Sequence, residues 1–401
     1  MRSSPSHGKQ PTSSPRTYFE LMVKAGAARP RLGIIVNPLA GIGGPAALKG
    51  SDGAATVAEA RARGARPEAP LRAERTLQAL AARVGPAELL AAPGAMGADL
   101  ARRVGFSVKA TSRSAPSETS ALDTRVAATA MRDADVGLLL FAGGDGTARD
   151  IHDAIGDQLP LLGIPAGVKM HSGVFAHSPE AAARAAEAAL RNGPSLPLRG
   201  ADIADVDEQA ARDGRVASIL YGSVRVPDLP RLVLPTKAGS PAQPGAELQA
   251  LCREIADTLE PSCLYLFGPG STTAMVLAAL GARGTLLGVD AVLDGQVVGK
   301  DLTESQTLAL LDTHLDSRLV VGLVGGQGML FGRGNRQLTA AVLSRVGADR
   351  ITVLSAADKL LALTPPTLWV DTGDPVLDKH LSGYIRVHVG PRQQIIMTVS
   401  S

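Results

Sequence analysis

The chain has 401 residues, of which 45% are hydrophobic, and its 41 basic and 38 acidic residues give a net charge of +3. This length predicts two domains, and the balanced charge gives no reason to expect a nucleic-acid or membrane partner. There is no run of 18 apolar residues, so the sequence predicts no membrane span. The two cysteines, Cys252 and Cys263, show no metal-ligand spacing and fit a reducing cytoplasm, which is where we expect the protein.

Strands and helices are predicted to alternate through the first half of the chain. Residues 1–30 begin with a stretch rich in Ser, Pro, Arg and Gly, and we expect them to form a disordered tail. Strands are predicted at residues 31–36, 89–92, 105–110, 136–142 and 161–165. Helices are predicted at 54–63, 73–84, 148–155 and 178–193, and on a face marked by Leu122, Val126 and Ala130. This order is typical of an α/β fold with a mainly parallel sheet covered on both faces.

A change of composition near residue 195 predicts a domain boundary. Prolines and charges become frequent over residues 194–247, and 217–226 has the composition of an irregular strand. Further strands are predicted at 263–267, 286–292, 319–324 and 351–354, with a helix at 274–280. We therefore expect a nucleotide- or phosphate-binding α/β domain at 31–195 and a C-terminal substrate domain at 196–401.

The most informative motif is Gly143-Gly144-Asp145-Gly146-Thr147, which links a predicted strand to a predicted helix. Glycines let phosphate oxygens approach the backbone, and a helix start adds free N–H groups and a positive dipole end. Asp145 is placed to hold Mg²⁺ or to accept a proton from an attacking hydroxyl. The alternative is an ordinary tight strand-to-helix turn.

Two further loops of the first half are candidates for the same site. Residues 37–44 include Gly41-x-Gly43, a weak match to a dinucleotide-binding fingerprint, and a structural turn explains them about as well. Residues 163–173 bring together Lys169, which suits a phosphate, and His171, which as a lone histidine is more often a packed or surface residue.

The second half contains two more glycine-rich loops. Residues 268–273 open a predicted helix, where backbone N–H groups and hydroxyls suit an anion, although an N-cap explains Ser271 or Thr272 equally well. Residues 325–336 contain Arg333 and Arg336, which suit bidentate phosphate binding unless the segment is a surface loop.

Taken together in this order, these motifs resemble the ATP-NAD/AcoX kinase family. The resemblance rests on Asn37-Pro, Gly-Gly-Asp145-Gly-Thr, Gly-Ile-Pro-Ala-Gly-Val-Lys169, Gly270-Ser-Thr-Thr and Gly-Arg333-Gly-Asn335, and it covers roughly residues 31–400. The nearest branch is that of predicted polyphosphate- or ATP-dependent NAD kinases. The resemblance implies a two-domain architecture, with an N-terminal Rossmann-like parallel sheet and a C-terminal α/β domain around an interdomain active site.

The resemblance also implies a reaction and a set of residues. The reaction is phosphoryl transfer from ATP or polyphosphate, with Mg²⁺, to the 2′-hydroxyl of NAD, which gives NADP. Asp145 is the expected catalytic residue and metal ligand. The expected nucleotide- and phosphate-binding residues are Asn37, Gly143, Gly144, Gly146, Thr147, Lys169, Gly270, Ser271, Thr272, Arg333 and Asn335. NAD and nucleotides are the expected partners, and we expect a homo-oligomer.

Other functions remain open at the level of sequence. The chain has no Asn-Glu pair after residue 200 of the kind that holds the substrate ribose in NAD kinases, and Gly270-Ser-Thr-Thr-Ala only partly matches their Thr-Gly-Ser-Thr-Ala-Tyr segment. The alternatives are a kinase of another hydroxyl compound and a non-catalytic nucleotide-binding or regulatory protein of the AcoX type. The third alternative is an NAD(P)-dependent oxidoreductase. The sequence after the 37–44 loop lacks the acidic residue that binds ribose in such enzymes, which argues against this function.

Overall fold

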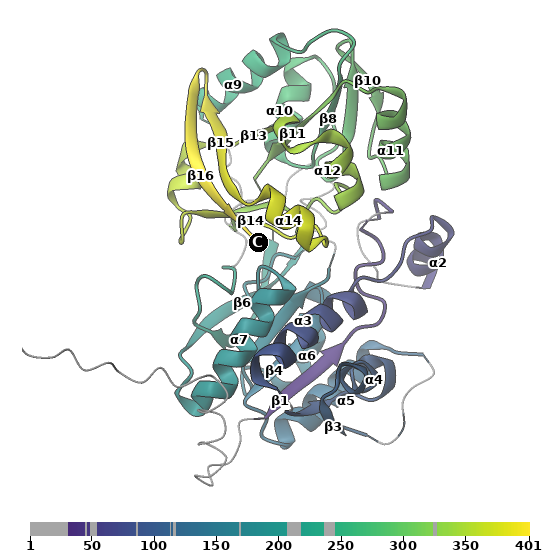
Figure 1. Cartoon of the computed structure of the whole chain (residues 1–401), viewed down its shortest axis with the longest axis vertical. Coiled ribbons are helices and arrows are strands. Elements are labelled where there is room, and N and C mark those ends of the chain that lie inside the picture. The colour runs from purple at the N-terminus through teal and green to yellow at the C-terminus, as the bar shows by residue number, and fades with distance from the viewer. Residues whose placement is uncertain are drawn as a thin grey trace, which may run out of the picture.

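The computed structural model forms two stacked α/β domains (Figure 1). It describes residues 31–44, 46–48, 54–85, 87–112, 114, 118–167, 170–206, 218–235, 245–323 and 327–401. The expected disordered tail at 1–30 and the expected phosphate ligand Lys169 lie outside these residues. Within the described ranges, no helix is both long and apolar enough to cross a membrane.

The first domain is built on a five-stranded parallel sheet with the order β3-β2-β1-β4-β5. Its strands are β1 (Leu32–Val36), β2 (Glu88–Ala91), β3 (Ser107–Ala110), β4 (Leu138–Gly143) and β5 (Leu161–Pro165). Its helices are α2 (Ala54–Ala62), α3 (Ala69–Val84), α4 (Ala98–Val104), α5 (Ala121–Asp133), α6 (Asp145–Ile155) and α7 (Pro179–Asn192). The strand order reverses between β1 and β4, and ligands of such sheets bind at the carboxyl ends of strands beside this reversal.

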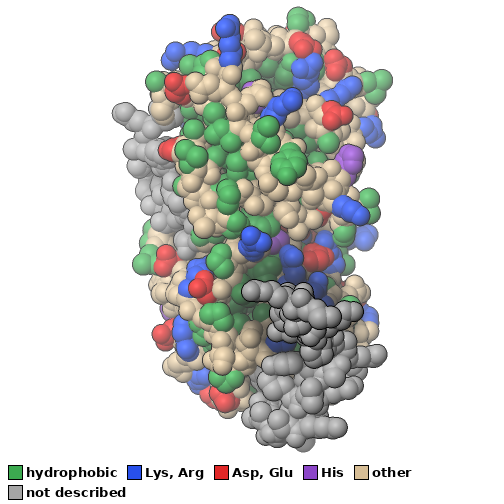
Figure 2. Space-filling model, turned by 60° about the vertical axis from the view of Figure 1, so that its left-hand side comes forward, with side chains coloured by type: hydrophobic (Ala, Val, Ile, Leu, Met, Phe, Trp, Pro, Cys, Tyr) green, Lys and Arg blue, Asp and Glu red, His purple; other side chains and the backbone are tan. Residues whose placement is uncertain are grey.

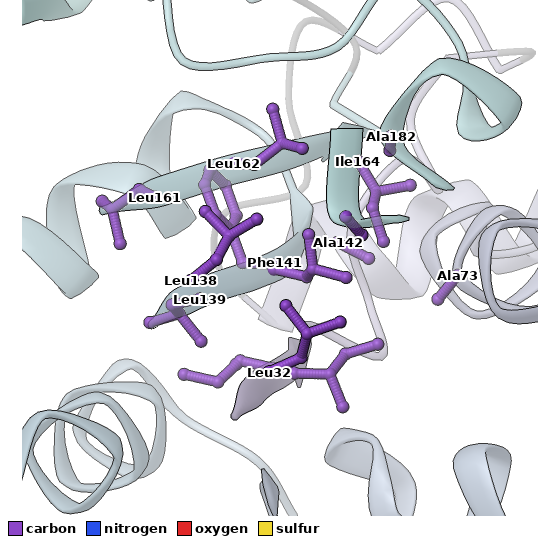
Figure 3. Packing of buried hydrophobic residues seen from close by; sticks show 14 of the residues in the cluster. Leu32, Ala73, Leu138, Leu139, Phe141, Ala142, Leu161, Leu162, Ile164 and Ala182 are labelled. Atoms are coloured by element: carbon purple, nitrogen blue, oxygen red, sulfur yellow. The ribbon is translucent and has the colours of Figure 1, made fainter. Parts of the chain in front are cut away.

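The core of this domain explains why its central strands are continuous apolar runs. All residues of β1 and β4 are buried, because helices cover both faces of the sheet. Figure 3 shows Leu138 and Phe141 on β4 beside Leu162 on the neighbouring strand β5, and the rings of Phe141 and Phe175 meet edge to face at 5.5 Å. The alternating parallel fold predicted from the sequence is confirmed.

Helix α5 forms as predicted, but the face marked by Leu122 and Val126 points to solvent. These side chains are 67% and 58% exposed, whereas Ala127 and Met131 are buried. Met131 reaches the sheet over Gly33 of β1, where an added Cβ would lie 2.7 Å from the methionine sulfur. The packing partner, rather than the hydrophobicity of the helix, thus decides which side is buried.

A two-stranded hairpin follows α7. The strand predicted at 217–226 is β7 (Ser218–Pro227), and it pairs antiparallel with β6 (Leu198–Val206), which the sequence analysis did not identify. Ala201, Ile203 and Val224 of the hairpin belong to the same hydrophobic core as the first sheet. The core therefore continues past residue 195, the position of the predicted domain boundary.

The second domain contains a nine-stranded mixed sheet with the order β10-β9-β8-β11-β13-β15-β16-β14-β12. Its strands are β8 (Leu264–Phe267), β9 (Asp290–Leu293), β10 (Gln296–Gly299), β11 (Ser317–Gly322), β12 (Met329–Phe331), β13 (Ile351–Leu354), β14 (Thr367–Val370), β15 (Gly383–Gly390) and β16 (Gln393–Ser400). Its helices are α9 (Ala246–Asp257), α10 (Ser271–Ala279), α11 (Glu304–Thr313), α12 (Ala340–Val346), α13 (Ala357–Leu361) and α14 (Pro375–Leu381).

Strands β8, β11 and β13 of this sheet are parallel neighbours, so their carboxyl ends share one edge. In Figure 1 the second domain lies above the first, with β14 and α14 at the seam between them. On the face drawn in Figure 2, Lys and Arg side chains lie at the waist where the domains meet. The seam therefore brings charged groups of the two domains close together.

Candidate active site

The Gly143–Thr147 motif forms the turn between β4 and α6. Helix α6 begins at Asp145 with Gly144 as its N-cap, three residues before the predicted start. A Cβ on Gly143 would lie 2.4 Å from the Thr147 hydroxyl oxygen, and one on Gly144 would lie 3.0 Å from the Gly167 Cα. The contact at Gly143 is too close for any side chain, so the turn requires glycine there, and the contact at Gly144 is tight enough that the Gly167 backbone would have to shift. Gly146 differs, because a Cβ there would meet Arg149 at an ordinary 3.6 Å.

Asn37 joins the loop after β1 to this turn. Its side-chain amide donates to the Thr147 hydroxyl at 3.1 Å, and its backbone N–H donates to the Ala142 carbonyl at 2.9 Å. Its side-chain oxygen accepts the Leu39 N–H at 3.1 Å, which shapes the loop itself. Both loops therefore lie at the carboxyl ends of neighbouring parallel strands, β1 and β4.

The Asp145 carboxylate is buried and holds the segment His171–Ser172. One oxygen accepts the His171 N–H at 2.6 Å, and the other accepts the Ser172 N–H at 3.1 Å and the Ser172 hydroxyl at 2.6 Å. Burial raises the pKa of Asp145 above its ordinary value, while the bond from the Ser172 hydroxyl and the charge of Arg333 oppose that rise. A carboxyl with a raised pKa accepts a proton more readily than an exposed aspartate does.

Arg333 reaches this site from the second domain. Its Nε donates to the Met170 carbonyl at 2.8 Å, and its Nη2 donates to the Ser172 carbonyl at 2.9 Å. The guanidinium lies 5.1 Å from the centre of the Phe175 ring. Burial lowers the pKa of Arg333 to about 10, so the group stays charged at neutral pH. Its Nη1 is buried and has no hydrogen-bond partner among the described residues.

Asn335 shapes the turn that presents Arg333. Its side-chain oxygen accepts the Gly332 N–H at 2.9 Å, and its amide donates to the Leu330 carbonyl at 2.8 Å. Gly332 has a φ of +111°, and a Cβ there would lie 2.3 Å from the Asp371 carbonyl oxygen. The contacts of Arg333 and Asn335 are thus with backbone carbonyls and N–H groups, and their expected roles in ligand binding stay predictions.

The loop at residues 268–273 lies at the carboxyl edge of the second sheet. The Thr273 hydroxyl donates to the Gly268 carbonyl at 2.6 Å, and Thr272 is buried where its Cβ would lie 3.3 Å from a Cβ added to Gly322. Leu338, just after the Arg333 turn, comes within 3.3 Å of the position of a Gly268 Cβ. The loop therefore packs against the segment that carries Arg333, and the binding roles expected for Gly270, Ser271 and Thr272 stay predictions.

A second group of buried charges crosses the seam, and sequence reasoning missed it. Arg72 of α3 donates to the Pro165 carbonyl and pairs with Asp371. Arg336 donates to the same carbonyl at 3.3 Å and pairs with Glu68. Burial lowers the pKa of each arginine to about 10. The local sequence Asp371-Thr-Gly-Asp-Pro375 is polar and suits a tight turn, but such a turn needs no distant ion pair to explain it.

The described residues show no ready-made cluster of the ligands that a bound Mg²⁺ requires. Among them, no three His, Cys, Asp or Glu side chains gather in a way that could hold a metal ion. The Asp145 carboxylate already accepts three hydrogen bonds, out of about four lone pairs. Mg²⁺ is commonly bound through substrate phosphates and water with few protein ligands. The expected role of Asp145 as a ligand of Mg²⁺ therefore stays a prediction, with the donor phosphates and water supplying the other ligands.

The fold and the site together define a class of protein. A parallel sheet, a glycine-rich turn ending in a buried aspartate at a helix start, and a second α/β domain that reaches this aspartate are features of nucleotide- and phosphate-handling proteins.

The comparisons with known proteins are more specific. The family model of the ATP-NAD kinase N-terminal domain matches residues 32–193, and that of the ATP-NAD kinase C-terminal domain matches residues 262–399. The chain therefore belongs to the ATP-NAD kinase family, whose domains indicate an NAD kinase-like phosphotransferase with nucleotide substrates. A search of the curated proteins found no match.

Proposed function

We propose that this protein transfers a phosphoryl group from ATP or polyphosphate to the 2′-hydroxyl of NAD, giving NADP. The observation that carries the proposal is the buried Asp145 carboxylate at the start of α6, on the carboxyl edge of a parallel sheet and bonded to the segment that Arg333 of the second domain binds. This is where an α/β sheet binds a ligand, and where the helix N-terminus favours phosphate.

In this proposal Asp145 orients the attacking hydroxyl and accepts its proton. Phosphoryl transfer passes through a loose transition state, so positioning and charge neutralisation supply most of the rate and a strong base is not required. The backbone of Gly144 and Gly146 and the hydroxyl of Thr147 are placed to meet the phosphates. Asn37 holds Thr147 in place. We expect Mg²⁺ to arrive on the donor phosphates rather than in a site prepared by the chain.

The direct test is an assay of the purified full-length protein with NAD, Mg²⁺ and either ATP or polyphosphate. We expect NADP to form with one or both donors, which also identifies the donor. Omitting the metal should abolish turnover. If no NADP forms with either donor while NAD and ATP both bind, the protein is a nucleotide-binding or regulatory protein rather than a kinase.

One observation favours a second candidate, a kinase of another hydroxyl compound. The chain has no Asn-Glu pair after residue 200 to hold the ribose of NAD. The same preparation should therefore be offered small hydroxyl compounds with ATP, and ADP release should be measured. Release with such a compound and none with NAD would change the acceptor while leaving the phosphoryl-transfer chemistry in place.

The expectations of a homo-oligomer and of a cytoplasmic protein remain parts of this proposal. Light scattering of the purified protein tests the first, and fractionation of the source cells tests the second.

A further inference from the structure

The segment Met170–Ser172 lies between two buried charged groups from different domains. Asp145 of the first domain binds its N–H groups, and Arg333 of the second domain binds its carbonyls. Asp145 is 8% exposed and Arg333 is 2% exposed, so neither contact is weakened by bulk water. The segment thus connects the two charged groups through its backbone.

A single peptide group forms the shortest connection. The carbonyl of Met170 and the N–H of His171 belong to the same peptide plane and point in opposite directions. Arg333 donates to this carbonyl at 2.8 Å, and the N–H on the other side donates to Asp145 at 2.6 Å. Rotation of this plane would break both bonds together, and hydrogen bonds in such a chain polarise one another.

A second peptide group fixes the other end of the segment. The Ser172 carbonyl accepts from Arg333 at 2.9 Å, and the Gly173 N–H of the same plane donates to the Asp202 carbonyl of β6 at 2.9 Å. The Ser172 hydroxyl also accepts the Ala204 N–H at 3.0 Å. The two nitrogens of the guanidinium therefore hold two peptide planes at once, in a fixed planar geometry that an ammonium group lacks.

We propose that Arg333 is a positioning residue for Asp145: it orients the Met170–Ser172 segment so that the carboxylate is held in place only when the second domain is seated on the first. The proposal rests on the proposed function for its kinetic consequence. Its structural consequence, the order of the segment, can be measured without any activity.

Arg336 provides a matched control in the same turn. It is also buried, also comes from the second domain and also donates to a carbonyl of the first domain, that of Pro165. The N–H of that peptide plane, from Ala166, donates to the Gly143 carbonyl at 3.0 Å rather than to Asp145. Loss of Arg336 should thus disturb the seam without releasing the two N–H groups that hold the carboxylate.

The structural test is amide hydrogen exchange of the full-length protein, read from peptides that cover residues 170–173. In Arg333→Met we expect the His171 and Ser172 amides to exchange on the order of tenfold faster or more, with α6 unchanged. Arg333→Lys keeps the positive charge but lacks the planar guanidinium, so the exchange of these two amides should also become faster, by a smaller factor. Arg336→Met should leave these two amides as in the wild type.

The kinetic test uses the same variants in the NADP assay. Arg333→Met should lower kcat roughly 10–100-fold, the cost of misplacing a catalytic group by about 1 Å, and change KM for NAD and the donor much less.

Unchanged exchange at His171 and Ser172 in both Arg333 variants would overturn the proposal, whatever the activity. Faster exchange with wild-type kcat would show that the segment does not control Asp145. An inactive wild type with the expected exchange pattern would reject the proposed function and keep Arg333 as the residue that orders the segment. Should Arg333→Met not fold, Arg333→Lys decides both tests.

Discussion

At the scale of single residues, the site depends on one carboxylate with an unusual environment. Asp145 is buried at a helix start, and three donors from His171 and Ser172 point at its oxygens. Burial and bonding push its pKa in opposite directions, and burial is the larger effect. The residue is therefore held in one geometry and is better suited to accept a proton than an exposed aspartate is.

Asp145→Asn is expected to lower kcat by roughly two to four orders of magnitude, the range for an acid–base or key electrostatic group, and to leave nucleotide binding nearly unchanged. Turnover of NAD to NADP and equilibrium binding of ATP measure the two quantities. Asp150→Asn is the matched control, because Asp150 is on the same helix and pairs with Arg125 at the surface. Near-wild-type turnover in a folded Asp145→Asn protein would remove Asp145 from the mechanism.

At the scale of elements, the β4–α6 turn shows which glycines the backbone requires and which leave space open. Gly143 has no room for a side chain because Thr147 occupies it, and a side chain on Gly144 would press on the Gly167 backbone at 3.0 Å. Gly146 has room, with Arg149 as the nearest group at 3.6 Å. The glycines of this motif therefore differ in role. Gly143 and Gly144 are needed for packing of the turn, whereas the open space at Gly146 suits a ligand.

Gly143→Ala is therefore expected to lower the melting temperature, since overpacking costs typically 1–3 kcal/mol, about 2–8 °C depending on size. Gly146→Ala should keep the melting temperature within about 1–2 °C and raise KM for the phosphoryl donor severalfold, because a methyl group would stand where phosphate approaches. Thermal unfolding and donor titration separate the two effects. An unchanged KM in Gly146→Ala would argue against phosphate over this residue.

At the scale of the whole molecule, buried charges join the two domains. Arg333 reaches the segment that holds Asp145, while Arg72 pairs with Asp371 across the seam. One oxygen of Asp371 is buried without a partner among the described residues. Such pairs contribute little net stability compared with apolar packing, but removal of one member leaves an uncompensated charge.

Asp371→Ala is accordingly expected to destabilise the protein by roughly 3–5 kcal/mol, because Arg72 would remain buried and charged. The double variant Arg72→Met/Asp371→Leu should lose less than Asp371→Ala alone, since no buried charge is left over. Denaturant unfolding of the single and double variants measures the coupling. Strictly additive losses would show that the two side chains do not act as a pair.

The sequence by itself determined the α/β class, the mainly parallel direction of the strands in the first sheet and the turn at Gly143–Thr147, because apolar runs, glycines and helix caps are local signals. It also carried the resemblance to the ATP-NAD kinase family, which the family models confirm. Predictions from the sequence were wrong where a residue far away in the chain decides which side chains are buried. The apolar spacing of Leu122 and Val126 marked the wrong face of α5, because Gly33 makes room for Met131 instead.

Only the tertiary structure decided how the site is assembled. Nothing local to Arg333 indicates that it binds the carbonyls of Met170 and Ser172, more than 160 residues away, or that their peptide groups hold Asp145. The pairing of Arg72 with Asp371 spans 299 residues. Contacts of this kind depend on how two separately folded sheets meet, and burial then gives their hydrogen bonds and charges the strength that the same groups would not have in water.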